Sequence, residues 1–190
     1  MACKVCPWWM GYFLVSPLRK LLQNPRKVIE PYIHAGMTVV EIGPGMGFFT
    51  LEIAKKVEAS GRVIAIDIQP QMLEQLEQRA AKANLHDRIE TRLARSDSMG
   101  MADLAVGVDF VFAYAVVHEL PDDRAFFKEV FEVLKPSAML FIAEPGHHVS
   151  VELFNEELQK AQEEGLEIVE LRQTGIGHTA LLRKRIRLQE

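Results

Sequence analysis

Three glycines at alternate positions stand between a short apolar run and a segment with helical spacing of apolar residues. Gly43, Gly45 and Gly47 belong to the stretch Glu41-Ile-Gly-Pro-Gly-Met-Gly. Glycine lets the backbone turn tightly and approach a ligand closely, and a helix that follows offers unpaired N–H groups. Phe48 stands where the dinucleotide pattern G-x-G-x-x-G requires its third glycine. The stretch predicts a ligand-binding loop, and a tight turn that binds nothing is the alternative.

Acidic and hydroxyl side chains end the next two apolar runs. Asp67 closes the run Arg-Val-Ile-Ala-Ile-Asp, and in doubly wound folds an acidic residue at this place accepts hydrogen bonds from ribose hydroxyls. It could also cap the helix that Pro70 begins. Ser96 and Asp97 follow the third run, where they could meet an adenine amino group or form a plain turn. Together these residues favour a nucleoside-containing ligand.

Residues able to move a proton follow the fourth and fifth runs. His118 is the best candidate for a general base, because histidine accepts protons near neutral pH, and a purely structural histidine is the alternative. Glu144, His147 and His148 follow the fifth run, so they could contact a substrate at the same edge of a sheet. Adjacent histidines rarely bind one ion together, and we therefore predict no metal site.

The first residues combine two thiols with a dense aromatic cluster, Trp8, Trp9, Tyr12 and Phe13. This much aromatic surface needs burial. A lid over the ligand pocket is favoured, and passive core packing and a membrane-surface anchor are the alternatives. Cys3 and Cys6 form a C-x-x-C without a second pair, so neither a zinc site nor a redox role is predicted.

The elements that must position these residues alternate along the chain. We expect helices between the first six strands, which gives an α/β, doubly wound, seven-stranded Rossmann-like sheet in a single domain. The last two strands are separated by about five residues, too few for a crossover helix, so they must form a C-terminal antiparallel hairpin. Residues 1–35 are expected to form a helical and aromatic cap, and residues 36–190 the ligand-binding domain. The expected strands are 38–43, 62–68, 88–94, 109–117, 138–145, 166–173 and 179–188.

Composition narrows the class of protein. The chain has 190 residues, a formal net charge of -4, 48% hydrophobic and 25% charged residues, which is typical of one globular domain. A mildly acidic balance speaks against a nucleic-acid partner. The longest apolar run near the start is too short to cross a bilayer, and two cysteines cannot form a disulfide framework. We therefore expect a cytoplasmic protein without a transmembrane segment.

In combination, these motifs resemble the class I S-adenosylmethionine-dependent methyltransferases. The resemblance extends over roughly residues 36–190 and includes the terminal hairpin. Within the family the chain is most similar to the small-molecule enzymes of the ubiquinone/menaquinone and arsenite type. The matching motifs, in order, are EIGPGMG, IAID, Ser96-Asp97, DFVFAYAVVHELPD and LKPSAMLFIAEP.

The resemblance implies S-adenosylmethionine as the cofactor and a role for each matched residue. The three glycines would admit its methionine part, and Glu41 would orient the loop and the amino group. Asp67 would bind the ribose hydroxyls, and Ser96 and Asp97 the adenine end. Two residues at the end of the fourth strand would line the methionine side, Ala113 and Tyr114.

A small molecule is the methyl acceptor that the resemblance implies, with His118 as the candidate base. The residues expected to contact it are Trp8, Trp9, Tyr12, Glu144 and His147. Three alternatives stay open: a protein or RNA methyltransferase, a nicotinamide-dependent oxidoreductase and a non-catalytic S-adenosylmethionine-binding module. The missing third glycine and the terminal hairpin speak against the oxidoreductase. The sequence predicts neither the methylated atom nor the oligomeric state.

Overall fold

The computed structural model describes residues 23–95, 97–174 and 177–186. They form two compact units, an N-terminal unit of residues 23–94 and a C-terminal unit that begins at residue 95. No helix within the described ranges is long and apolar enough to cross a membrane. The boundary expected at residue 35 stays a prediction. Several residues singled out above lie outside the described ranges: Cys3, Cys6, Trp8, Trp9, Tyr12, Phe13 and Ser96.

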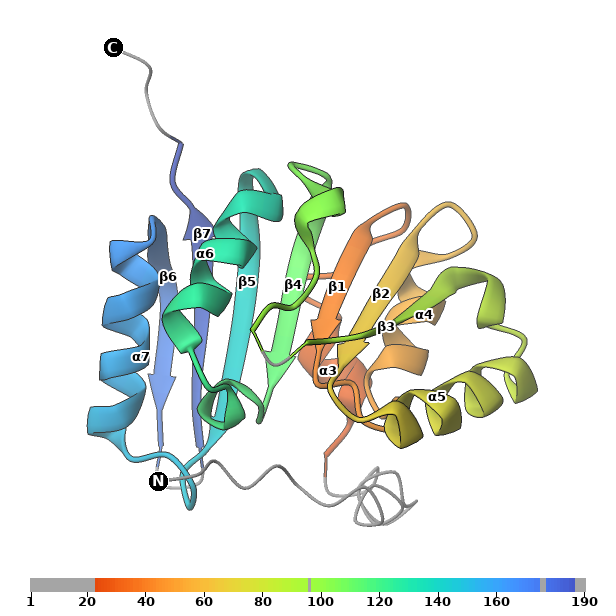
Figure 1. The fold of residues 1–190 in the computed structure, drawn as a ribbon, viewed down its shortest axis with the longest axis horizontal. Helices are drawn as coiled ribbons and strands as arrows, with labels where there is room; N and C mark the ends of the chain where they lie inside the picture. The colour runs from red at the N-terminus through yellow and green to blue at the C-terminus, as the bar shows by residue number, and fades with distance from the viewer. Residues whose placement is uncertain (1–22, 96, 175–176, 187–190) are drawn as a thin grey trace. The chain divides into compact units, whose positions relative to one another are not determined.

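The N-terminal unit is built on parallel strands in the order β3-β2-β1 (Figure 1). Strands β1 and β2 are apolar and buried along nearly their whole length, as parallel strands covered on both faces are. The strands are β1 (Thr38–Ile42), β2 (Arg62–Asp67) and β3 (Ile89–Leu93), and the helices are α3 (Pro25–Ile29), α4 (Thr50–Val57), α5 (Pro70–Lys82) and the 3-10 turn η2 (His86–Arg88).

Helix α5 forms where its sequence signals place it. Pro70 occupies the first turn, where its missing N–H costs nothing. Asn84 follows the end of the helix with φ +54°, the left-handed conformation that asparagine tolerates. The buried face consists of residues at helical spacing, Met72, Leu73, Leu76 and Ala80.

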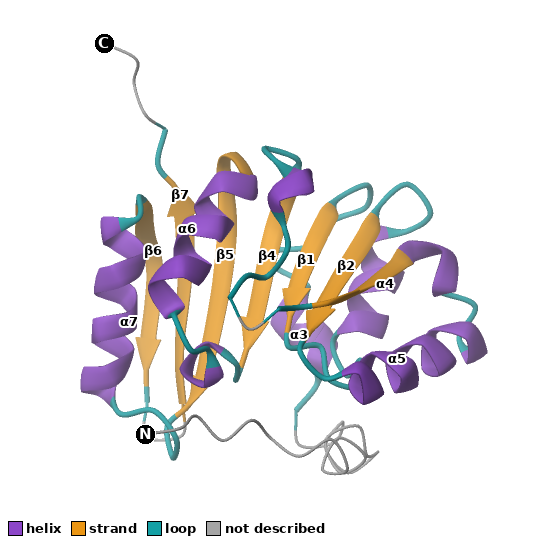
Figure 2. Cartoon of the chain, in the orientation of Figure 1, coloured by secondary structure: helices purple, strands orange, loops and turns teal. Residues whose placement is uncertain are grey.

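The C-terminal unit has the strand order β4-β5-β7-β6 (Figure 2). Strands β4 and β5 are parallel, and β7 is antiparallel to both of its neighbours, β5 and β6. The predicted C-terminal hairpin is confirmed. The strands are β4 (Val108–Tyr114), β5 (Leu134–Pro145), β6 (Leu166–Gln173) and β7 (Gly177–Lys184), with helices α6 (Asp123–Val133) and α7 (Val151–Glu163) and 3-10 turns η3 (Ala102–Leu104) and η4 (Val117–Glu119).

Strand β4 is shorter than its apolar sequence predicts. The strand ends at Tyr114 because Ala115 takes φ +56°, which turns the chain out of the sheet and into η4. This turn places His118 immediately after the strand. Strand β5, in contrast, begins four residues earlier than expected, directly after the last residue of α6.

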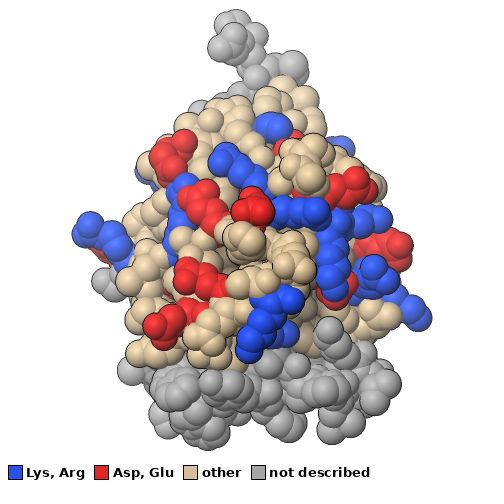
Figure 3. Space-filling view, turned by 90° about the vertical axis from the view of Figure 1, so that its right-hand side faces the viewer, with Lys and Arg blue, Asp and Glu red and all other residues tan. Residues whose placement is uncertain are grey.

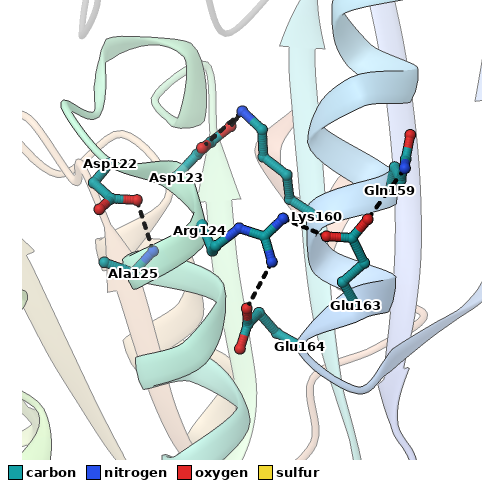
Figure 4. Close-up of polar contacts among 8 residues, drawn as sticks. All are labelled: Asp122, Asp123, Arg124, Ala125, Gln159, Lys160, Glu163 and Glu164. Atoms are coloured by element: carbon teal, nitrogen blue, oxygen red, sulfur yellow. Dashed lines mark hydrogen bonds and ion pairs between the residues drawn. The ribbon is translucent and has the colours of Figure 1, made fainter.

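Helices α6 and α7 lie side by side in the C-terminal unit and are joined by ion pairs (Figure 4). Lys160 Nζ lies 2.7 Å from Asp123 Oδ2, and Arg124 contacts Glu163 and Glu164. Pairs this exposed contribute about 0–1 kcal/mol each. Burial of apolar side chains stabilises more than such pairs do, and each helix has a buried apolar face, with Phe126, Phe127 and Val130 in α6 and Phe154 and Leu158 in α7.

Charge on the face seen in Figure 3 is mixed. Lys and Arg side chains are interspersed there with Asp and Glu side chains. Surfaces that bind a phosphate backbone concentrate basic residues instead. On β7, Arg183 is ion-paired with Glu167 of β6 at 2.5 Å, which fits a solvated strand face.

Candidate functional site

The glycine loop of the N-terminal unit joins β1 to α4 in a conformation that needs glycine. Gly43, Gly45 and Gly47 have φ values of +65°, +54° and +83°. At Gly47 an added Cβ would stand 2.4 Å from Leu76 Cδ1 of α5, so the loop and this helix are in direct contact. Gly43 N–H donates to the carbonyl of Ile66 in β2, at 2.9 Å. The loop is therefore fixed from both neighbouring elements.

Asp67, the last residue of β2, organises the same loop. Its Oδ2 accepts a hydrogen bond from Gly45 N–H at 3.1 Å, and its Oδ1 accepts one from Gln69 N–H at 2.9 Å. Burial, which leaves the residue 8% exposed, raises the pKa of Asp67, although the backbone N–H groups oppose this. Asp67 thus ties the loop to the start of α5. A carboxylate has about four lone-pair sites, so Asp67 can also accept a hydrogen bond from a ligand hydroxyl.

Glu41 is a second acidic group of this unit, in β1 and 2% exposed. Burial, opposed by the Thr50 hydroxyl and supported by the charge of Asp67, raises the pKa of Glu41 to about 8. Within the described residues, Glu41 Oε2 has no hydrogen-bond partner. A buried polar atom without a partner is costly, and a cation beside it would remove that cost. The two acidic side chains at the loop, Glu41 and Asp67, therefore fit a ligand that carries a positive charge and hydroxyl groups.

Sequence reasoning missed Arg79. This α5 side chain donates a hydrogen bond to the carbonyl of Met46 in the glycine loop, and burial lowers the pKa of its guanidinium. From the sequence alone, Arg79 cannot be distinguished from the other charged residues expected on the exposed face of an amphipathic helix. Its spacing of three from Leu76 is the one signal that could have placed it toward the loop.

His118 and Glu144 form a hydrogen-bonded pair in the C-terminal unit. Glu144 is 2% exposed; its Oε1 accepts the Val117 N–H at 2.8 Å, and its Oε2 contacts His118 Nδ1. A carboxylate at Nδ1 favours the tautomer with the proton on Nδ1, which leaves Nε2 as the acceptor. The pair has the arrangement of a general base and its orienting group. The burial of Glu144 favours this orienting role over direct contact with a substrate.

Two opposing effects act on the His118 ring. Partial burial lowers the pKa of His118, but the hydrogen bond and the charge of Glu144 outweigh it, and the net pKa is raised. The ring of His148 stacks on that of His118 with centroids 5.5 Å apart, and the ring centroids of His147 and His148 are 4.3 Å apart. The structure thus brings together the proton-transfer candidates from the fourth and fifth strands. The described residues include no group of three metal-ligating side chains placed to hold an ion.

The other predicted cofactor contacts are also in the C-terminal unit. Asp97 is exposed and paired with Arg95, with Nε and Oδ1 3.1 Å apart, and this hydrogen bond lowers the pKa of Asp97. Ala113 is buried, and Tyr114 is half-buried and stacks on Phe112 with centroids 6.2 Å apart. Their roles toward a cofactor stay predictions.

Comparison with known proteins gives one family. The family described as "Methyltransferase domain" matches residues 33–184. An arsenite methyltransferase from Halobacterium salinarum is 31% identical over 109 residues, 57% of this chain and 27% of that protein. A demethylmenaquinone methyltransferase from Lactobacillus johnsonii is 30% identical over 112 residues, 59% of this chain and 45% of that protein. The chain therefore spans less than half the length of these two curated relatives.

Solved structures extend the likeness to nearly the whole chain. A SAM-dependent methyltransferase from Aquifex aeolicus has a TM-score of 0.83 and 25% identity, with 94% of this chain and 99% of that chain covered. This confirms the predicted seven-stranded Rossmann-like fold. The 4+2 cyclase SpnF, at TM-score 0.72, 14% identity and coverages of 86% and 80%, shares the fold alone. The fold by itself therefore does not fix the chemistry.

Proposed function

The chain belongs to the methyltransferase domain family, and from this premise we propose that it transfers a methyl group from S-adenosylmethionine to a small-molecule acceptor. The observation that carries the proposal is the buried carboxyl group of Glu41 in β1, the strand that leads into the glycine loop: its Oε2 has no hydrogen-bond partner within the described residues, and the charge of Asp67 acts on it. S-adenosylmethionine carries a sulfonium and an ammonium group, and a cation beside Glu41 would favour the ionised form of this buried group. The pyrophosphate of a nicotinamide cofactor is anionic and would be repelled by acidic groups at the loop.

Residues of the N-terminal unit would hold the cofactor by complementary chemistry. Glu41 would take the α-ammonium group, which supplies the partner that its Oε2 lacks. Asp67 would accept hydrogen bonds from the ribose hydroxyls in addition to those from the Gly45 and Gln69 N–H groups. The adenine and methionine contacts of Asp97, Ala113 and Tyr114 are proposed on the resemblance alone.

The acceptor would be activated by His118. S-adenosylmethionine supplies a methyl group on a positively charged sulfur, a leaving group that needs no protonation. As the acceptor atom forms its bond to the methyl carbon, His118 Nε2 takes the acceptor's proton and Glu144 stabilises the imidazolium. Release of this proton to solvent restores the neutral ring. The names of the arsenite and demethylmenaquinone relatives support a small acceptor of this kind.

Cofactor binding is tested first. In calorimetric titrations of the whole chain, S-adenosylhomocysteine is expected to bind and NAD to give no heat of binding. Binding of NAD alone would contradict the proposal and restore the oxidoreductase alternative.

Methyl transfer is tested next, with methyl-labelled S-adenosylmethionine and, as candidate acceptors, arsenite, a short-chain demethylmenaquinone and bulk RNA. Label is expected in a small molecule, and label only in RNA or in none of the candidates contradicts the proposal. With an acceptor in hand, His118→Gln should lower kcat by about 10²–10⁴-fold and leave S-adenosylhomocysteine affinity unchanged. His86→Gln, at an exposed histidine of η2, is the matched control.

A further inference from the structure

The turn of residues 146–149 that follows β5 includes His148, whose ring lies over the face of His118. The two ring centroids are 5.5 Å apart and the ring planes differ by 14°, values typical of stacked aromatic rings. Glu144 already contacts His118 at Nδ1. That hydrogen bond holds one edge of the imidazole, and the stacked ring restricts its tilt. The two contacts together fix the direction in which Nε2 points.

The backbone of this turn is itself fixed on both sides of His148. The N–H groups of His148 and Val149 both donate to the carbonyl of Pro145, each at 3.0 Å. Val149 is buried, and Ser150 then caps α7 by accepting the Leu153 N–H at 3.3 Å. The exposed ring of His148 is therefore attached to a backbone with little freedom to move.

His178 of β7 gives the turn a further contact. Its Nε2 donates to the carbonyl of Val149 at 3.0 Å, because a carbonyl oxygen can only accept. The ring is 3% exposed and packs against Phe154 of α7, with centroids 5.4 Å apart. Within the described residues its Nδ1 has no hydrogen-bond partner, which is costly for a buried polar atom. An apolar side chain would pack without this cost, so the cost indicates that the bond to Val149 matters.

The sheet register relates His178 to the orienting carboxylate. His178 stands opposite Glu144 in the β5–β7 pair, and directly opposite residues of an antiparallel pair share one face of the sheet. Glu144 contacts His118 directly. His178 acts on the same ring indirectly, through Val149 and then His148. One level of the sheet therefore supports both the edge and the face of the imidazole.

We propose that His148 is a positioning residue for His118: its ring holds the face of the imidazole, and His178 holds the turn through the carbonyl of Val149. For its catalytic meaning the inference rests on the proposed role of His118 as the base. Proton transfer needs Nε2 within hydrogen-bond reach of the acceptor, so a ring free to tilt spends less time in the productive geometry. His148 neither binds the acceptor nor takes its proton.

Nuclear magnetic resonance of histidine-labelled whole chain tests the positioning without any acceptor. The nitrogen shifts of the neutral His118 ring, assigned with His118→Gln, give the share of the tautomer protonated at Nδ1, which Glu144 favours. His148→Ala should lower this share, because a tilting ring exchanges its Glu144 bond for water. His148→Phe keeps a stacked ring and should restore the share. His147→Ala, in the same turn, should leave it as in wild type.

Changes at His178 test the support of the turn. His178→Phe removes the donor to Val149 and should cause the same loss of the Nδ1 tautomer, whereas His178→Gln keeps a side-chain N–H and should lose less. Equal tautomer shares in wild type and His148→Ala overturn the inference, as do an equal loss in His147→Ala and a failure of His148→Phe to restore the share. Since the ring of His148 is exposed, its variants should fold even where changes at the buried His178 are not tolerated.

The catalytic consequence is measured with an acceptor from the transfer assay. His148→Ala should lower kcat by about tenfold and leave KM and S-adenosylhomocysteine affinity unchanged, and His148→Phe should restore kcat. A change in KM with kcat intact would mean that His148 binds the acceptor, which overturns the inference. If no acceptor is methylated, the proposed function fails alone, because the tautomer shares decide the positioning without an acceptor.

Discussion

The guanidinium of Arg79 in α5 donates a hydrogen bond to the carbonyl of Met46 in the glycine loop. The contact links a residue far along the chain to the loop that would receive the cofactor. Leu76, one turn earlier on the same helix, packs against Gly47. Helix α5 therefore holds the loop in place through these two contacts.

Arg79→Met should weaken binding of S-adenosylhomocysteine by roughly tenfold, about 1.4 kcal/mol, because the loop loses its bond to α5. Calorimetry gives the dissociation constant. Arg88→Met is the control, since Arg88 also donates to a backbone carbonyl, that of Ala54 in α4, at 3.3 Å, but does not touch the loop. Equal losses in both variants would show a general effect on stability and not a role for Arg79.

Asp67→Ala should weaken S-adenosylhomocysteine binding by about 1–3 kcal/mol, because the Gly45 and Gln69 N–H groups and the ribose hydroxyls lose a charged acceptor. Asp67→Asn keeps one side-chain acceptor and should lose less. Asp87→Asn, at an exposed carboxylate in η2, should bind as wild type does. Unchanged affinity of Asp67→Ala in the same titration would remove Asp67 from the cofactor site.

Gly47→Ala should lower the free energy of unfolding by about 1–2 kcal/mol through left-handed strain alone, and by more because its Cβ meets Leu76. Gly100→Ala separates the two effects. Gly100 has φ +69° but nothing within 4 Å of an added Cβ, so it should suffer only the strain. Chemical denaturation measures both variants, and equal losses would mean that the Leu76 contact adds nothing.

In the absence of cofactor, the contribution of Glu41 to the free energy of unfolding should fall as the pH rises from about 4.5 toward 8. The pKa of Glu41 is 4.5 in its ordinary state and about 8 when buried here, so over this window the folded state binds more protons than the unfolded state. The stabilisation that Glu41 contributes is fully present below pH 4.5 and is lost as the pH rises through about 8. Glu157 of α7 is buried as well, and with a pKa of about 8 it contributes with the same sign.

Denaturation of wild type and Glu41→Gln across this pH window measures the contribution of Glu41. The variant should show a shallower decline. Parallel pH profiles would mean that Glu41 does not hold a proton in the folded state.

The fold and the family could be predicted from local signals. Alternating apolar runs and helical segments, and the short connection before His178, were enough to predict the sheet with its antiparallel hairpin. The predicted family is confirmed by the family match, and the predicted fold by the likeness to the Aquifex aeolicus structure. The end of β4 was wrong by three residues because the apolar run continues through Ala115, whose positive φ no sequence pattern announces.

The site was only partly predictable. His118 and Glu144 could be placed after neighbouring strands, but their hydrogen bond depends on the η4 turn, which follows from the backbone at Ala115. Arg79 was missed because a single charged residue on an amphipathic helix does not reveal what its long side chain reaches. His178 was expected just before the last strand, so its burial within β7 was not predicted.

The place of β7 between β5 and β6 bears on how the chain is made. As the ribosome delivers residues in order, β5 and β6 emerge before the strand that both of them pair with, and β6 has no β-strand neighbour until residues 177–184 arrive. The C-terminal unit can complete its sheet only after residues 177–184 have been synthesised. A nascent chain that stopped before Gly177 would lack a central strand and not an edge strand.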